Sequence, residues 1–301
     1  MDNLRKELGQ VLEEWQILTD EPLSLHTTFR VGGPADLYLT PQEPQLAAVK
    51  RLLAAYQVPA AVIGNGSNLL ASDQGFRGAV IEIGRQMAEI SVEGERVSVQ
   101  AGALLAKTAI EAYKAGLCGM EFAAGIPGSV GGALVMNAGA YGGEMKDIVT
   151  AARVLTEDGK ILCLPAEQMD FSYRHSCVAG RGYLVLGAEL KLTKDDPEKI
   201  RQNMEELKKR RISKQPLEYP SAGSTFKRPQ GYFAGKLIMD AGLSGFSVGG
   251  AQVSPKHCGF VVNTGGALAS DVLAVIRHVQ RTVQEKFGVA LETEVKLLGE
   301  F

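Results

Sequence analysis

Two glycine-rich stretches constrain the fold more than any other feature of this sequence. Nine glycines lie between Gly116 and Gly143 and seven between Gly242 and Gly266, out of 35 in the 301-residue chain. They follow no Gly-X-Y period, which excludes a collagen-like chain. Apolar residues interleave with the glycines of the first stretch, which argues against a flexible linker. Such a pattern indicates backbone packed closely against a flat or anionic ligand, whereas the second stretch suggests no specific chemistry.

Length and charge narrow the class of protein. The length predicts two or three globular domains. Lys and Arg total 32 against 34 for Asp and Glu, so the net charge of −2 gives no footprint for nucleic acid or an anionic membrane. No apolar run approaches the roughly 18 residues of a membrane span, and the charged N-terminus lacks the core of a signal peptide. Four dispersed cysteines without C-x-x-C suit reduced thiols. We expect a cytoplasmic protein with no nucleic-acid, membrane or obligate protein partner.

Apolar periodicity predicts an alternation of helices and strands. Helical spacing occurs near residues 4–12, 44–56, 104–115, 197–211 and 270–287, and strand patterns over 60–63, 79–83, 90–92, 97–100, 152–155, 161–164, 183–192 and 289–298. Ser270 is the expected N-cap of the last helix, and Gly288 is its expected stop. Asp158-Gly159 predicts a hairpin turn, and Pro216 and Pro220 mark an expected domain boundary.

The segment Gly64–Leu69 follows a buried strand and begins like a dinucleotide-binding fingerprint. Leu69 replaces the third glycine of that fingerprint and no helix pattern begins there, so the Rossmann interpretation fails. Small residues still allow backbone N–H groups to approach a phosphate, with Ser67 and Asn68 as additional donors. On this segment alone, an anion-holding nest and an ordinary tight turn are about equally supported.

Other motifs are weaker. Gly102–Thr108 lacks the glycines of a P-loop and predicts only a helix N-terminus. Gly245–Gly249 matches G-x-S-x-G, with Asp271 and His278 in hydrolase order, but the motif needs a strand before it and a helix after it. A serine hydrolase using Ser247 is therefore a minor alternative. The histidine and cysteine spacings predict no metal site. The run Lys208–Arg211 predicts a solvated helix end, although a ligand diphosphate could use it or Lys214.

Five ordered motifs resemble the UDP-N-acetylenolpyruvoylglucosamine reductase family. They are Gly64–Leu70, Glu121–Gly139, Phe171–Ser176, Pro220–Lys227 and Leu291–Val295. The resemblance extends from Thr28 to Gly299 and is greatest to the shorter of the family's two subtypes. It implies an NADPH-dependent flavoenzyme that reduces the enolpyruvyl ether of UDP-N-acetylglucosamine enolpyruvate to UDP-N-acetylmuramate for peptidoglycan synthesis. The nearest alternative is another oxidoreductase on the same FAD fold, followed by the serine hydrolase and, third, by a non-catalytic nucleotide-binding module.

The resemblance also implies a fold. It is α+β, with a two-lobed FAD-binding domain of the vanillyl-alcohol-oxidase type and a C-terminal α+β substrate-binding domain. The expected lobes are residues 1–78 and 79–213, and the substrate domain is 214–301, with its last strand (289–298) returning toward the flavin site. FAD is the expected bound cofactor, NADPH the co-substrate and a UDP-sugar the small-molecule substrate.

Three catalytic residues are implied by the resemblance. In the family, hydride passes from reduced flavin to C3 of the substrate and a proton reaches C2. Arg174 is expected to stabilise the substrate carboxylate, Ser224 to donate the proton, and Glu294 to orient or assist the same end of the site. The strand pattern places Glu292 and Glu294 on one polar face, and only the family's Leu-Glu-x-Glu-Val spacing selects Glu294.

Binding residues follow from the same motifs. Those implied for FAD are Gly64, Asn65, Gly66, Ser67, Asn68, Leu69, Gly125, Ile126, Pro127, Gly128, Ser129, Gly132, Asn137 and Gly139. Those implied for the substrate are Tyr173, Lys214, Lys227 and Arg228. Some family members have Asn where this chain has Arg228, so the contacts to the diphosphate are expected to differ from theirs.

Overall fold

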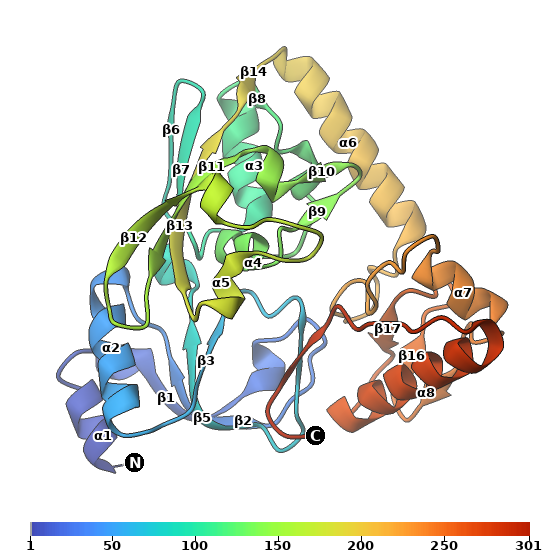
Figure 1. Cartoon of the computed structure of the whole chain (residues 1–301), viewed down its shortest axis with the longest axis horizontal. Coiled ribbons are helices and arrows are strands. Elements are labelled where there is room, and N and C mark those ends of the chain that lie inside the picture. The colour runs from blue at the N-terminus through green and yellow to red at the C-terminus, as the bar shows by residue number, and fades with distance from the viewer. Residues whose placement is uncertain (1) are drawn as a thin grey trace. The chain divides into compact units, whose positions relative to one another are not determined.

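The computed structural model describes residues 2–301 and combines helices with several small sheets (Figure 1). The chain divides into two compact units. Unit 1 comprises Met1–Thr19, Leu37–Asn65 and Gly78–Arg211, and unit 2 comprises Asp20–Asp36, Gly66–Arg77 and Ile212–Phe301. Each unit has a hydrophobic core of its own. No helix within residues 2–301 combines the length and the apolar character needed to cross a membrane.

The N-terminal part of the chain contributes a four-stranded sheet in which the spatial order of the strands differs from their order in the sequence. Its strands run β1-β2-β5-β3, and β3 pairs in parallel with β5. Helix α2 buries Leu46, Val49 and Leu53, which share one helical face because their spacing follows the helical period. The bounds are α1 Asp2–Leu8, β1 Ile17–Pro22, β2 Pro34–Leu39, α2 Glu43–Ala55, β3 Ala60–Ile63 and β5 Phe76–Glu82.

A five-stranded antiparallel sheet of order β12-β11-β13-β7-β6 forms the centre of unit 1. The strands are β6 Ile90–Glu93, β7 Arg96–Gln100, β11 Val149–Leu155, β12 Ile161–Pro165 and β13 Leu184–Lys191. The hairpin predicted at Asp158-Gly159 is confirmed, with Gly159 at φ +81°. Helix α3 (Leu105–Lys114) is also confirmed, and Gly116 follows it at φ +71°.

Shorter elements complete unit 1. They are η1 Glu14–Gln16, η3 Arg85–Met87, β8 Leu117–Cys118, η4 Glu121–Ala123, α4 Val130–Val135, β9 Gly139–Ala140, β10 Gly143–Glu144, η5 Met145–Asp147, η6 Ala166–Gln168, α5 Cys177–Gly180 and β14 Thr193–Lys194. Helix α6 (Pro197–Lys214) begins where the Asp195-Asp196-Pro197 sequence predicts it, since Asp196 accepts the N–H of Glu198 at 3.0 Å.

Unit 2 is built around helix α8 and a small antiparallel sheet of order β15-β16-β17. Figure 1 shows α7 and α8 beside β16 and β17. Helix α8 buries the predicted apolar face and ends at Gly288, whose φ of +68° is left-handed. The elements are η2 Leu23–Leu25, β4 Leu69–Ala71, α7 Ala234–Asp240, β15 Ser247–Val248, β16 Ala251–Val253, β17 Val261–Asn263, α8 Ala269–Phe287 and β18 Lys296–Leu298.

The expected N-cap of α8 is wrong. The helix begins at Ala269 after an extended Leu268, so Ser270 lies inside its first turn. The carboxylate of Asp73 caps the helix instead, accepting the N–H groups of Ala269 at 2.6 Å and Ser270 at 2.9 Å. A cap supplied from so distant a part of the chain leaves no local sequence signal.

The last predicted strand is also only partly regular. Leu291 and Val295 are buried, as the alternation requires, but regular strand pairing is limited to β18, which pairs in parallel with β4. Thr293 instead forms an isolated bridge to Phe226. The segment thus changes partner along its length, and the alternation shifts by one residue, leaving Leu297 51% exposed and Leu298 buried.

Candidate active site

Ser224 lies in unit 2 on a segment that is held from both sides. Next to it, Thr225 is fully buried and accepts the N–H of Val261 on its hydroxyl at 2.9 Å. The N–H of Thr225 donates to Gly259 at 2.8 Å, and its carbonyl oxygen accepts the N–H of Glu294 at 2.9 Å. Ser224 itself is exposed. The local backbone therefore fixes an exposed hydroxyl beside the C-terminal segment that carries Glu294.

Glu292 and Glu294 differ in their surroundings. Glu292 is 74% exposed and forms an ion pair with Lys227, with 3.0 Å between Oε2 and Nζ. Glu294 is half-buried, and its carbonyl oxygen accepts a hydrogen bond of 3.1 Å from the Asn68 side chain. The structure thus separates two glutamates that the strand pattern left equivalent, and it places Lys227 in a surface ion pair.

The second half of the Gly64–Leu69 loop, in unit 2, is tightly built. Gly66 has φ +60°, and a Cβ there would lie 1.9 Å from the carbonyl oxygen of His26. Its own carbonyl oxygen accepts the N–H of Thr28 at 3.2 Å. The buried Thr28 hydroxyl oxygen finds no hydrogen-bond partner among residues 2–301. A buried hydroxyl of this kind is normally satisfied, so the loop fits a polar ligand that would contact it.

The first half of that loop, in unit 1, lies against the central glycine cluster. A Cβ on Gly64 would lie 2.2 Å from the hydroxyl oxygen of Ser129, so a side chain there would displace that hydroxyl. The Asn65 amide donates to the carbonyl oxygen of Pro127 at 2.9 Å. Ser129 is buried and caps α4 through Gly132 at 3.4 Å. Close backbone approach without side chains is the arrangement that a phosphate or a flat ring requires.

The glycine cluster contains a helix that the sequence pattern did not predict. Helix α4 includes Gly131 and Gly132, which lower helix propensity and so hide the helix from pattern analysis. Gly131 is nevertheless tightly packed, because a Cβ there would lie 3.0 Å from the Cβ of Ala101. Helix α7 was missed for a similar reason, since it lies within a glycine-rich part of the chain.

Arg174 lies in unit 1, on a tight turn. It is half-buried with φ +56°, and its guanidinium carbon is 5.0 Å from the centroid of the Tyr173 ring. Its Nη2 donates to the carbonyl oxygen of Gly139 over 3.4 Å. Tyr173 is 47% exposed. A cation fixed on a turn, with a neighbouring exposed aromatic ring, is suited to recognise a carboxylate.

The other basic residues predicted to bind the substrate differ in their exposure and contacts. Arg228 is exposed, with its guanidinium carbon 4.0 Å from the centroid of the Phe233 ring. Lys214 is exposed, and its charge adds to burial in lowering the pKa of His257. Arg211, at the end of the basic run, is not solvated as expected. Its side chain packs against Gly125, where an added Cβ would lie 3.1 Å from Cδ of Arg211. Burial lowers the pKa of Arg211.

The serine-hydrolase alternative finds no support in the geometry. Ser247 begins the two-residue strand β15, which leads into strand β16 and not into a helix. Asp271 accepts the N–H groups of Leu268 and Gly250, and His278 stacks on Phe246 with 4.1 Å between ring centroids. Asp271 and His278 therefore have structural contacts of their own. Among residues 2–301, no group of three His, Cys, Asp or Glu side chains could hold a metal ion.

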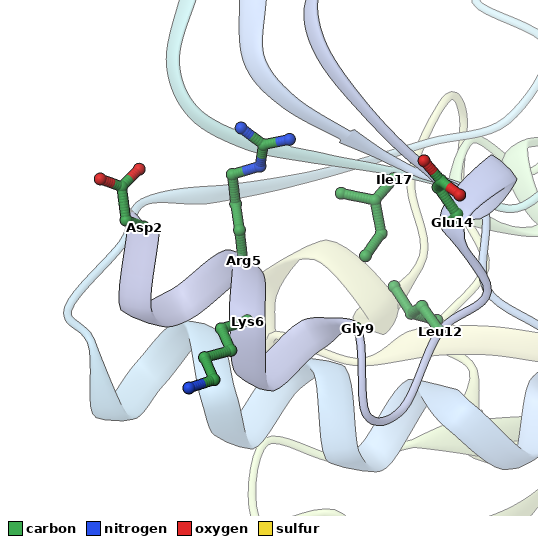
Figure 2. A pocket seen from close by; sticks show the side chains of 7 residues that line it. All are labelled: Asp2, Arg5, Lys6, Gly9, Leu12, Glu14 and Ile17. Atoms are coloured by element: carbon green, nitrogen blue, oxygen red, sulfur yellow. The ribbon is translucent and has the colours of Figure 1, made fainter.

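A pocket of about 380 Å³ lies beside α1 (Figure 2). Side chains of both charge signs line it, together with Leu12 and Ile17. None of the predicted site residues lines this pocket. We therefore do not assign it to the reaction.

Comparisons with known proteins identify the family of the chain. Residues 35–164 match the FAD binding domain family, and residues 215–298 match the C-terminal domain of UDP-N-acetylenolpyruvoylglucosamine reductase. A UDP-N-acetylenolpyruvoylglucosamine reductase of Agathobacter rectalis is 54% identical over 308 residues, covering 98% of both chains. The enzyme of that name from Pediococcus pentosaceus is 52% identical, covering 97% of this chain and 98% of its own.

Solved structures give the same relationship. The UDP-N-acetylenolpyruvylglucosamine reductase of Thermus caldophilus has a TM-score of 0.80 and 40% identity, covering 92% of this chain and 97% of its own. Phl p 4, a grass pollen allergen with glucose dehydrogenase activity, has a TM-score of 0.51 and 18% identity over 64% of this chain and 44% of its own, a likeness of fold alone. The expected α+β fold, with a vanillyl-alcohol-oxidase-type FAD-binding domain followed by a second domain, is confirmed.

Proposed function

This chain belongs to the UDP-N-acetylenolpyruvoylglucosamine reductase family, and from that premise we propose that it reduces UDP-N-acetylglucosamine enolpyruvate to UDP-N-acetylmuramate in the cytoplasm. FAD is its bound cofactor and NADPH its co-substrate. The observation that carries the proposal is the 54% identity, over 98% of both chains, with a relative of that name. The product is a precursor for peptidoglycan synthesis, and the reaction requires no partner protein.

The residues around Gly64 and Gly125 fit FAD. When bound, FAD supplies the hydride, which originates from NADPH. The loop Gly64–Leu69 would hold the pyrophosphate, since the space at Gly64 and Gly66 excludes a side chain and the buried Thr28 hydroxyl lacks a partner among the described residues. The segment Gly125–Gly139 would lie along the pyrophosphate and the ring system, contributing Gly125, Ile126, Pro127, Gly128, Ser129, Gly132 and Gly139. The side chain of Asn137, which the family motif also implies for FAD, is instead fully buried and bonded to protein groups.

Arg174 stabilises the negative charge that develops on the substrate. Reduction at C3 of the enolpyruvyl group pushes charge through C2 onto the carboxylate as an enolate-like species. A guanidinium can bind that carboxylate through two parallel hydrogen bonds and stays protonated throughout. Its placement on a tight turn supports this role, because a cation already oriented costs no reorganisation during the reaction.

Ser224 delivers the proton to C2. A hydroxyl is a weak acid, but the acceptor is carbanion-like, which makes the transfer feasible. The exposure of Ser224 and the hydrogen bonds that hold Thr225 support a fixed donor open to the substrate. Glu294 orients the same end of the substrate, and its half-buried position favours it over Glu292. Water is the natural source of the proton that restores Ser224.

Four residues are proposed to bind the UDP-sugar. Arg228, Lys214 and Lys227 provide positive charge for the diphosphate, and Tyr173 provides a ring beside Arg174. Among these, Lys227 already pairs with Glu292, so its share of diphosphate binding requires exchange of that surface ion pair. Surface pairs of this kind contribute only about 0–1 kcal/mol, which makes the exchange inexpensive.

The proposal is tested on the purified protein by its visible spectrum and by NADPH oxidation with and without UDP-N-acetylglucosamine enolpyruvate. We expect a flavin spectrum and NADPH consumption that depends on the enolpyruvyl substrate. A colourless protein after careful purification would contradict the FAD assignment. A protein that contains flavin but oxidises NADPH at the same rate with and without this substrate would indicate another oxidoreductase on the same fold.

A further inference from the structure

The turn that carries Arg174 is closed by two reciprocal hydrogen bonds. The N–H of Ser172 donates to the carbonyl oxygen of His175 at 3.1 Å, and the N–H of His175 donates back to Ser172 at 3.2 Å. Tyr173 and Arg174 form the tip, and Arg174 has the left-handed φ of +56° that non-glycine residues rarely adopt. A conformation of this kind persists only where the surroundings impose it.

Asn137 supplies a contact that fixes this turn. Its amide nitrogen donates to the carbonyl oxygen of Ser172 at 3.0 Å and to Oε2 of Glu144 at 2.8 Å. Its amide oxygen accepts the backbone N–H of Lys146 at 2.9 Å. Asn137 is fully buried, so both hydrogens of its amide nitrogen are used by protein groups and its side chain is closed to solvent.

Glu144 gives this contact an electrostatic component. Its carboxylate binds the Lys146 ammonium at 2.9 Å as well as the Asn137 amide. The hydrogen bond from Lys146, with smaller contributions from Asn137 and the charge of Arg174, outweighs burial and lowers the pKa of Glu144. Glu144 pairs with Gly139 across β9 and β10, and the carbonyl oxygen of Gly139 accepts the Arg174 guanidinium. Glu144 is therefore an anion on the hairpin that Arg174 contacts.

We propose that Asn137 is a positioning residue for Arg174, which clamps the Ser172–His175 turn to the β9–β10 hairpin so that the guanidinium is oriented before substrate binds. This inference rests on the proposed function, because it gives Asn137 a purpose in charge stabilisation by Arg174. The side chain of Asn137 acts through the turn and not as a direct ligand of FAD. Asn also suits the site conformationally, because its φ of +41° is tolerated mainly by Gly, Asn and Asp.

Two substitutions remove the clamp in different ways. Asn137→Asp keeps the shape and the acceptor for Lys146, but it loses the donors to Ser172 and Glu144 and sets a second carboxylate against that of Glu144. Asn137→Gly removes the side chain without adding charge and accepts the same backbone conformation. Glu144→Gln keeps an acceptor for Asn137 and removes only the negative charge. Thr108→Val is the matched control, since Thr108 is a fully buried hydroxyl in α3 that bonds the carbonyl oxygen of Leu104 at 3.0 Å.

The experiment combines hydrogen exchange with half-reaction kinetics on the FAD-loaded enzyme. In both Asn137 variants we expect amide exchange in the peptide covering residues 172–175 to accelerate about tenfold or more, because its orienting bond is lost. Flavin reduction by NADPH should stay within about twofold of wild type, while flavin oxidation by substrate should slow about 10- to 100-fold, the scale of a small misplacement. Glu144→Gln should keep the slow exchange of the turn.

Three outcomes would overturn the inference. They are wild-type exchange of the 172–175 peptide in both Asn137 variants, equal slowing of the two half-reactions, and the same acceleration of that peptide in Thr108→Val. A different result would contradict the proposed function. In that case, UDP-N-acetylglucosamine enolpyruvate would fail to oxidise the reduced flavin of the wild-type protein. The exchange measurement on the turn does not depend on substrate, so the two failures are distinguishable.

Discussion

The backbone N–H of Glu294 donates a hydrogen bond of 2.9 Å to the carbonyl oxygen of Thr225. Together with the bridge between Phe226 and Thr293, it aligns two segments that are far apart in the sequence. One segment carries the proposed proton donor Ser224, and the other carries Glu294. A residue near the C-terminus thus becomes a neighbour of the Ser224 segment through backbone pairing, within one unit of the fold.

The two glutamates of this C-terminal segment should behave differently. Glu294→Gln is expected to slow flavin oxidation by substrate about 10- to 1,000-fold, because it removes a charged group from the proposed site. Glu292→Gln should change this rate less than about twofold and the free energy of unfolding by less than about 1 kcal/mol, since it breaks only an exposed pair with Lys227. Stopped-flow kinetics and urea unfolding check both. A slower Glu292 variant and an unaffected Glu294 variant would reverse the assignment.

Gly64→Ala tests the closest backbone approach in unit 1. The new methyl group would meet the hydroxyl oxygen of the buried Ser129 at 2.2 Å, so the Ser129 side chain, the loop or α4 must move. We expect a loss of about 1–3 kcal/mol in the free energy of unfolding and a lower flavin-to-protein ratio after purification. Absorbance at the flavin band, relative to protein, measures the second effect.

Gly180→Ala is the matched control for that substitution. Nothing lies within 4 Å of the position of its Cβ, and its φ is not left-handed. Its flavin content and unfolding free energy should equal those of wild type. If Gly64→Ala retains full flavin and the same stability as Gly180→Ala, the Gly64 loop is not the close-approach site described above.

Asp73 makes the stability of unit 2 dependent on pH. Burial tends to raise the pKa of Asp73, but hydrogen bonds from Ser270 and Ala269 outweigh it and lower the pKa below its usual 3.8. A carboxyl group with a lowered folded pKa adds stability above its unfolded pKa, and that stability disappears as pH falls through the folded pKa. The contribution should therefore be complete above about pH 4 and be lost progressively below it.

Asp73→Ala should cost about 0.5–2 kcal/mol at neutral pH, the usual value of a helix N-cap, and less below pH 4. Ser270→Ala, which removes the residue expected to cap α8 from sequence, should cost less. Urea unfolding of both variants across the acid range measures the difference. A larger loss for Ser270→Ala, or an Asp73→Ala effect independent of pH, would contradict this capping arrangement.

Local patterns predicted the elements whose signals are local. Helices α2, α3 and α8 were predicted because their apolar spacing is regular, and Gly116 and Gly288 marked two helix ends because only a left-handed residue closes them easily. The missed elements depend on tertiary contacts. Helix α4 contains two glycines, one of which packs closely against Ala101, and no propensity scale records such a contact.

In the candidate site, too, local motifs could be identified from the sequence, whereas tertiary contacts could not. The motifs identified Arg174, Ser224 and Glu294 as candidates, but periodicity could not distinguish Glu294 from Glu292, because the difference lies in the partner Lys227 on another segment. The clamp at Asn137 was equally hidden, since the groups that it bonds lie on the β10–η5 region and on the Ser172–His175 turn. Pattern analysis reads neighbours in sequence, whereas these contacts join distant parts of the chain.

The most direct test of the central claim is the comparison of two half-reactions in Ser224→Ala by stopped-flow absorbance of the flavin. Removal of the proposed proton donor should leave flavin reduction by NADPH nearly unchanged and should slow flavin oxidation by UDP-N-acetylglucosamine enolpyruvate by several powers of ten, roughly the upper range for a lost general acid. Equal slowing of both half-reactions, or oxidation at the wild-type rate, would contradict the assignment of Ser224 as the proton donor.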